Sequence, residues 1–245
     1  MAKQVGIYQF NGKLGEAVGS KARKGYQVVK RAPVATKNPS TKAQVMQRTL
    51  FAACVATGAA VPEAAIIGFR PYAKGDGMSI RNAFSKILQK SGAISVTWRD
   101  VDQEAVAEPD QTLVEYSRGN QPNVICGPLN ADAPGSVEFT YDIGTEINPH
   151  TTNLIAILYC PDFKEWRVKK ITDMAASGSV VFDNLPANWN GVKVYAYCYT
   201  QCFESADQKQ AYYNSVVFSA TGDIKVAESN AKYSKTLCVG QNTVG

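Results

Sequence analysis

The sequence contains a single histidine and no complete nucleophile or phosphate-loop motif, which argues against most enzyme classes. His150 follows Pro149 in a predicted loop, and no GxSxG motif accompanies it. Near the start of the chain, Ser20 separates Gly19 from Lys21, where a phosphate loop needs glycine and lysine side by side. Histidines, cysteines and carboxylates do not recur at metal-site spacings. We therefore predict a protein that is not an enzyme and that has no catalytic residues, cofactor or metal.

Long apolar runs are also missing. The best candidate for a membrane span, residues 50–69, is interrupted by Pro62 and Glu63. The first residues lack the apolar core of a secretory signal. We expect no membrane partner and assembly in a reducing cytoplasm, where cysteines stay reduced and buried. There are six: Cys54, Cys126, Cys160, Cys198, Cys202 and Cys238.

Acidic residues are scarce at the start of the chain, and this makes the start strongly basic. Residues 1–48 hold ten Lys and Arg but one acid, Glu16, whereas residues 49–245 hold 16 Lys and Arg against 20 acids. This pattern predicts contact with a polyanion such as DNA or with an acidic protein surface. The alternative is a solvated hairpin face that only keeps the protein soluble. We call the seven candidate residues the basic arm: Lys13, Lys21, Arg23, Lys24, Lys30, Arg31 and Lys37.

The first 109 residues are predicted to form a domain of glycine-rich β-hairpins and two helices. Glycine recurs between residues 1 and 35 beside β-branched and aromatic residues, a pattern typical of short hairpins. Ser40 and Thr41, followed by Gln44, signal the start of a helix that Gly58 and Pro62 break or restart. Helical spacing of apolar residues predicts a second helix over residues 78–88.

Beyond this domain the sequence predicts an immunoglobulin-like antiparallel β-sandwich over residues 110–227. The predicted strands cover residues 112–116, 136–141, 153–159, 179–182, 192–199 and 216–218. Residues 228–245 are predicted to be a polar C-terminal tail, in which the apolar patch at 237–239 is either an added strand or a partner contact. The predicted fold class is α+β, mainly β.

Tyrosines alternate in the last part of the predicted sandwich. Tyr195, Tyr197 and Tyr199 fall on one face of a strand. Because the hydroxyl at the tip of a tyrosine ring favours contact with water, this face is a candidate interface. Core packing is the alternative explanation for alternating aromatics.

Several segments give the chain a resemblance to a known family. One pair combines the glycines of residues 11–25 with the NP-[ST]-x-x-x-Q element at residues 38–44, and a second pair combines residues 185–197 with residues 212–215. In these the sequence resembles an uncharacterised two-part family common in gut Bacteroidales genomes and in their phages and prophages. The resemblance implies a β-sandwich in the C-terminal half and a mobile-element context, and it implies no catalytic residues.

Together these features predict a non-enzymatic structural protein of a phage virion, associated with the capsid or the neck-tail region through the basic arm. We expect its partners to be other virion proteins or copies of itself in a homo-oligomer, first in the host cytoplasm and then in the virion. The alternative is a nucleic-acid-binding accessory protein packaged with phage DNA or acting on it. A glycan-active enzyme with paired carboxylates is a third hypothesis.

Overall fold

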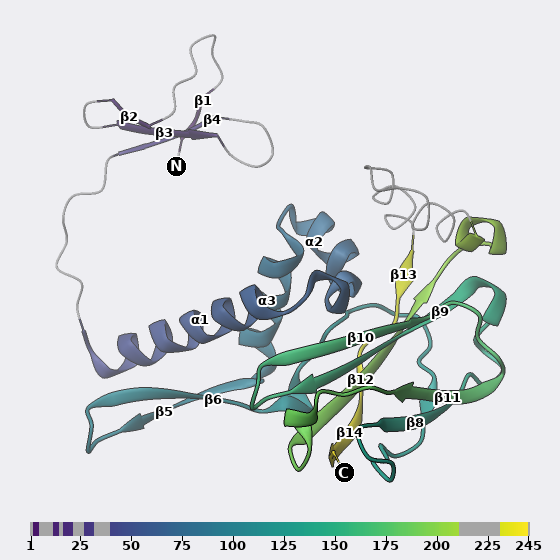
Figure 1. Cartoon of the computed structure of the whole chain (residues 1–245). Helices are drawn as coiled ribbons and strands as arrows, with labels where there is room; N and C mark the ends of the chain where they lie inside the picture. The colour runs from purple at the N-terminus through teal and green to yellow at the C-terminus, as the bar shows by residue number, and fades with distance from the viewer. Residues whose placement is uncertain are drawn as a thin grey trace.

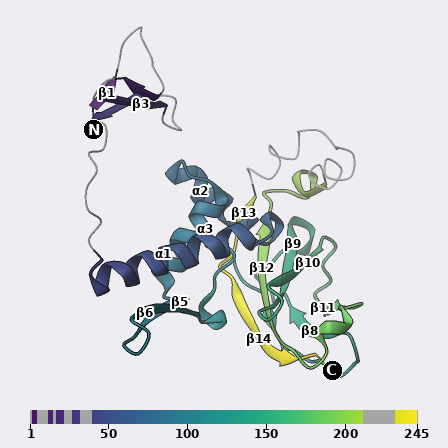
Figure 2. The same cartoon turned by 60° about the vertical axis from the view of Figure 1, so that its left-hand side comes forward.

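A computed structural model describes residues 2–4, 12–14, 17–21, 27–31, 40–210 and 231–244 (Figure 1). Its class is α+β and mainly β, as predicted. The first described residues form an antiparallel N-terminal sheet in the order β1-β4-β3-β2, which stands apart from the other elements in both views (Figure 1, Figure 2). Its strands are β1 (Ala2–Gln4), β2 (Gly12–Leu14), β3 (Ala17–Lys21) and β4 (Gln27–Arg31).

A helical layer follows, and both predicted helices are confirmed within it. Thr41 precedes the first helix, but its side chain makes no capping hydrogen bond. Ser79 caps the helix that it precedes, because its Oγ accepts a hydrogen bond from the backbone N–H of Asn82 at 3.2 Å. The elements of this layer are α1 (Lys42–Ala60), η1 (Glu63–Ala65), η2 (Ile67–Phe69), α2 (Arg70–Asp76) and α3 (Ile80–Ser91).

A two-stranded hairpin beside α1 is absent from the sequence prediction. Its strands are β5 (Ile94–Arg99) and β6 (Glu104–Pro109), which pair antiparallel. Lys42 at the start of α1 contacts this hairpin through Asp100 and the Trp98 ring. The alternation of Ile94, Val96 and Trp98 with polar residues is the period-two signal that would have identified β5.

Two antiparallel sheets make up the rest of the described chain. The large sheet has the order β10-β9-β12-β13, with β14 also paired to β12, and the facing sheet has the order β11-β8-β7. The large sheet contains β9 (Thr152–Cys160), β10 (Glu165–Ile171), β12 (Lys193–Cys202), β13 (Lys232–Tyr233) and β14 (Leu237–Thr243). The facing sheet contains β7 (Ile125–Cys126), β8 (Val137–Asp142) and β11 (Ser177–Phe182).

Alternate residues of the central strands enter two different apolar cores. On β9, Leu154 and Leu158 join the cluster that lies between the two sheets, whereas Ile155 and Ile157 join the cluster that also contains Phe84 of α3. The helical layer and the facing sheet accordingly lie on opposite sides of the large sheet (Figure 1, Figure 2). Every residue of β9 is buried as a result, which explains the apolar run from Leu154 to Leu158.

Four of the predicted strands are confirmed as β8, β9, β11 and β12, and one is wrong. Residues 112–116 form part of the single turn η3 (Gln111–Leu113) and an irregular segment. The backbone N–H of Tyr116 donates to the Thr236 side chain at 2.8 Å instead of to a neighbouring strand. Apolar residues such as Val114 are buried there singly, so the run mimics a strand in sequence. Residues 216–218 lie outside the described residues.

The predicted C-terminal tail contains a strand of the large sheet. Leu237 opposes Cys198 and Thr243 opposes Lys193 along the β12–β14 pairing, with a bulge between Ala196 and Tyr197. The added-strand alternative for residues 237–239 is therefore the observed one. The predicted division between residues 1–109 and 110–227 stays a prediction.

Candidate polyanion-binding or partner-binding surface

The N-terminal sheet carries four residues of the basic arm. Lys13 lies on β2, Lys21 on β3, and Lys30 and Arg31 on β4. The register sets Lys13 opposite Val18 and Val18 opposite Lys30, so that these three positions form one row across three strands. The remaining members of the basic arm, Arg23, Lys24 and Lys37, lie outside the described residues.

Lys30 and Arg31 are exposed. Successive residues of a strand point to opposite faces of the sheet, so each face of β4 presents one cation. Gly19, which opposes Val29 on the neighbouring strand, is buried. The sheet therefore offers positive charge on both of its faces.

The positive charge continues beyond the basic arm into the helical layer. Residues 1–99 hold 16 Lys and Arg against three Asp and Glu, whereas residues 100–245 hold 10 against 18. The boundary predicted at residue 48 leaves out the helical contribution, although the low acid count up to residue 99 signals it. The exposed cations of residues 40–99 are Lys42, Arg48, Lys74, Lys90 and Arg99.

Some cations of the helical layer serve the fold rather than a surface. Lys86 lies 2.7 Å from the Asp76 carboxylate, and its Nζ stands over the Tyr72 ring at 5.5 Å. The hydrogen bond to Asp76 raises the pKa of Lys86. Arg81 donates hydrogen bonds to backbone carbonyl oxygens at the end of α1. These side chains fix the arrangement of the helices.

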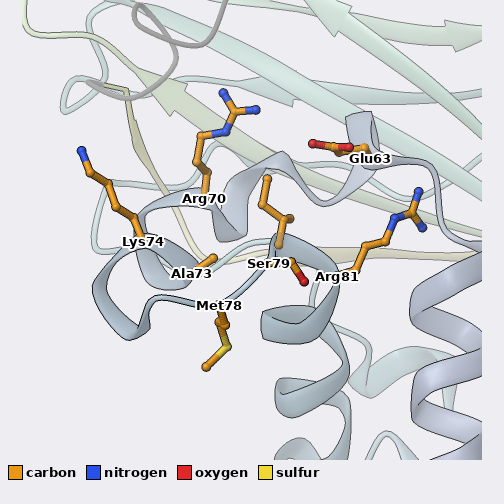
Figure 3. Close-up of a pocket in the computed structure, with 8 residues that line it drawn as sticks. Glu63, Arg70, Ala73, Lys74, Met78, Ser79 and Arg81 are labelled. Atoms are coloured by element: carbon orange, nitrogen blue, oxygen red, sulfur yellow. The ribbon is translucent and has the colours of Figure 1, made fainter. Parts of the chain in front are cut away.

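A hollow of about 430 Å³ lies between η1, α2 and the start of α3 (Figure 3). Arg70, Lys74, Arg81 and Glu63 are among the residues that line it. Figure 3 shows the cationic ends of Lys74 and Arg81 on opposite sides of the view, so they do not converge on one point. The hollow therefore does not form an anion-binding cradle.

The tyrosine face belongs to the interior of the chain. Tyr197 and Tyr199 are at most 1% exposed, and their hydroxyls donate to the backbone carbonyl oxygens of Gln111 at 2.7 Å and Ala65 at 3.2 Å. Tyr195 is half-buried beneath the Lys193 ammonium. The core-packing alternative holds for Tyr197 and Tyr199, because the helical layer covers this face of the large sheet. These two side chains are not available to another protein.

The lone histidine, the possible metal sites and the possible membrane spans complete the candidates considered from the sequence. His150 is exposed in η4 (Pro149–Thr151), and its backbone N–H donates to the Asn148 side chain at 3.0 Å. Among the described residues, no three or more His, Cys, Asp or Glu side chains gather where a metal ion would be held. Within the same part of the chain, no helix combines the length and apolarity that crossing a bilayer requires.

The described elements define an α+β, mainly β protein with a basic first part and an acidic remainder. The chain belongs to DUF6266, a family of unknown function, whose model matches residues 9–218. This agrees with the predicted resemblance to an uncharacterised family. No curated protein and no solved structure matches the chain.

Proposed function

We propose that the chain is a non-enzymatic structural protein of a phage virion, held at the capsid or the neck-tail region by its cationic first part. The observation that carries this proposal is the separation of charge: 16 Lys and Arg against three acids before residue 100, and an acidic excess after it. Exposed Lys30 and Arg31 on the N-terminal sheet present this charge to a neighbour. A protein with two oppositely charged parts can contact a neighbouring copy or an acidic virion protein at one end and leave the other end free.

The remaining structure suits a scaffold. The large sheet is covered on both sides, and the hydroxyls of Tyr197 and Tyr199 donate to backbone carbonyl oxygens within the chain. The two sheets that share a core support an immunoglobulin-like sandwich as the finer fold assignment. Under this proposal the family occurs in gut Bacteroidales and in their phages and prophages. The chain assembles in the host cytoplasm, and each particle holds several copies.

Purified particles of a phage that encodes the chain provide the test. Mass spectrometry of the particles is expected to detect the protein at several copies per particle, and cryo-electron microscopy is expected to place it at the capsid or the neck. Lys30→Glu combined with Arg31→Glu should lower its incorporation. The matched control is Lys193→Glu combined with Lys232→Glu, which makes the same change of charge at exposed positions of the large sheet. Absence of the protein from washed particles contradicts the proposal.

The alternative, a nucleic-acid-binding accessory protein, rests on the same exposed cations. Phosphate contacts make affinity fall steeply as salt rises. Under this alternative the full chain binds duplex DNA at low salt, and replacing Lys21, Arg23, Lys24 and Arg31 by Ala weakens binding to all sequences and flattens the salt dependence. Retention on DNA that is the same at low and high salt removes this alternative and leaves an acidic protein as the partner.

A further inference from the structure

Two cysteines from different sheets meet inside the molecule. Cys126 lies on β7 of the facing sheet and Cys198 on β12 of the large sheet, and their Sγ atoms are 3.3 Å apart. A disulfide has an S–S distance of about 2.05 Å, so the two sulfur atoms need to approach by little more than about 1 Å. The sequence separates the two residues by 72 positions, so only the tertiary structure brings them together.

No other described pair of cysteines has its sulfur atoms in contact. Cys238 lies on β14 beside β12, but its side chain packs against the core beneath the helical layer, whereas Cys198 belongs to the core between the sheets. The plane of the large sheet therefore separates these two thiols. Cys202 accepts a hydrogen bond from the Thr152 hydroxyl at 3.6 Å. Cys126 is thus the one partner that Cys198 can reach.

The two thiols differ in access to solvent. Cys126 lines a surface hollow of about 650 Å³, together with Gly127, Thr140 and Gly178. Cys198 is 1% exposed. The hydrogen bond between the thiols lowers the pKa of Cys126 and raises the pKa of Cys198, because it favours the charged form of Cys126 and the protonated form of Cys198. A small oxidant in the hollow therefore meets the more acidic thiol first.

We propose that Cys126 and Cys198 form an oxidant-responsive thiol pair that closes into a disulfide between the two sheets. In the first step the Cys126 thiolate attacks one oxygen of a peroxide, the O–O bond breaks, and with one proton taken up the products are Cys126 sulfenic acid and water. In the second step Cys198 sulfur attacks Cys126 sulfur, the S–O bond breaks, and the Cys198 proton leaves with the hydroxyl group as water. The cysteines lose two electrons in total, and hydrogen peroxide gains them.

The disulfide would fasten a weakly held strand. Only two residues of β7 pair with β8, and Ile125 beside Cys126 is 69% exposed. Cys198 lies in the middle of the large sheet, where β12 pairs with β9 on one side and β14 on the other. Linking the two constrains a long loop in the unfolded chain. We expect the melting temperature to rise by roughly 5–10 °C on oxidation.

The test treats the full chain with hydrogen peroxide and maps its cysteines by mass spectrometry without reduction. The expected product has lost two hydrogen atoms and yields one cross-linked peptide pair containing Cys126 and Cys198. In Cys198→Ser, a sulfenic acid should accumulate on Cys126 and react with dimedone. In Cys126→Ser, the buried Cys198 should stay a thiol. Cys202→Ser is the matched control and should close the cross-link like the natural sequence.

Mapping of the natural sequence tests the proposal even where a variant folds poorly. Over-oxidation of Cys126 to sulfinic acid while Cys198 remains a free thiol overturns it. A cross-link between any other pair of cysteines overturns it as well. An oxidised protein that contains the expected cross-link but melts at the temperature of the reduced protein refutes the proposed fastening of β7.

Discussion

The guanidinium of Arg81, in the first turn of α3, donates a hydrogen bond of 2.9 Å from Nη1 to the carbonyl oxygen of Val61, just beyond the end of α1. The carbonyl oxygens of Gly58 and Ala59 accept from the same nitrogen at 2.9 and 2.8 Å. The last carbonyls of a helix have no partner within the helix and carry the negative end of its dipole. Arg81 therefore caps α1 from a neighbouring helix.

Replacing Arg81 should destabilise the chain. We expect Arg81→Ala to lower the free energy of unfolding by about 2 kcal/mol, because several carbonyl oxygens lose a charged donor. Arg81→Lys should restore part of the loss, since an ammonium group keeps the charge but not the planar geometry. Urea unfolding measures both. Lys90→Ala, at an exposed position of the same helix, is the control and should change little; equal effects of the two alanine variants contradict the capping role.

The hydroxyl of Tyr197 is expected to contribute to stability. It donates to the Gln111 carbonyl oxygen at 2.7 Å in a buried site, so Tyr197→Phe leaves that oxygen without this donor. We expect a loss of about 1–2 kcal/mol. Tyr195→Phe, on the same face of β12 but half-buried, should cost much less. Thermal and urea unfolding of both variants check the difference, and a neutral Tyr197→Phe would sink the prediction.

Stability should fall at alkaline pH because of buried phenols. Burial raises the pKa of both Tyr116 and Tyr197 far above the unfolded value of about 10. The unfolded chain therefore releases these protons first, and stability that is fully present below about pH 10 is lost as the pH rises above it. The urea midpoint should drop in step with the appearance of tyrosinate absorbance. The drop should be shallower in Tyr197→Phe, and an identical pH dependence would count against this explanation.

Because of Lys170 on β10, the free energy of unfolding should be larger at mildly alkaline pH than at pH 7. Burial and the nearby Lys209 ammonium lower the pKa of Lys170 to about 8. The unfolded value is about 10.4, so between about pH 8 and pH 10 the unfolded chain binds more protons and stability rises with pH. Lys170→Met should therefore stabilise the chain at pH 7 by roughly 1–3 kcal/mol, and the gain should shrink by about pH 10. Lys169→Met, at the exposed neighbouring position, should show no such pH dependence in urea unfolding.

Two glycines should respond in opposite directions to alanine. A Cβ at Gly119 would overlap the Tyr233 carbonyl oxygen of β13, which cannot move without disturbing the large sheet. Gly119→Ala should destabilise by roughly 2–3 kcal/mol. Gly75, in α2, has open space around it, and Gly75→Ala should stabilise by about 0.5–1 kcal/mol. Melting temperatures that shift in the same direction contradict this assignment.

The spacing of apolar residues along short segments correctly predicted several helices and strands. The helical spacing of apolar residues in 78–88 predicted α3, whose buried residues include Phe84 and Leu88. Regular alternation predicted β8, where Val137, Phe139 and Tyr141 are buried and the residues between them are exposed. In each case the spacing of apolar residues in the sequence matches the repeat of the helix or strand, so the buried face can be predicted without tertiary information.

The candidate surface was predictable only in part. Clustering of Lys and Arg identified Lys30 and Arg31, because charge is a property of composition and both side chains are exposed in the structure. The same reasoning gave no means to separate Arg81, whose charge caps α1, from Lys74, which is exposed. Which cations meet a partner and which meet the chain's own carbonyl oxygens depends on the packing of one helix against another.

The amino-acid order alone determined the charge separation, the two main helices and the β-rich remainder, since each follows from composition or from a short repeat. The tertiary structure decided which face of each strand packs against the helical layer, which against the other sheet, and which is exposed to solvent. It buried Tyr197 and Tyr199 under the helical layer, paired residues 237–243 with β12, and brought Cys126 within 3.3 Å of Cys198. These outcomes depend on contacts between residues far apart in the chain, and no local period encodes the partner that a strand or a thiol will meet.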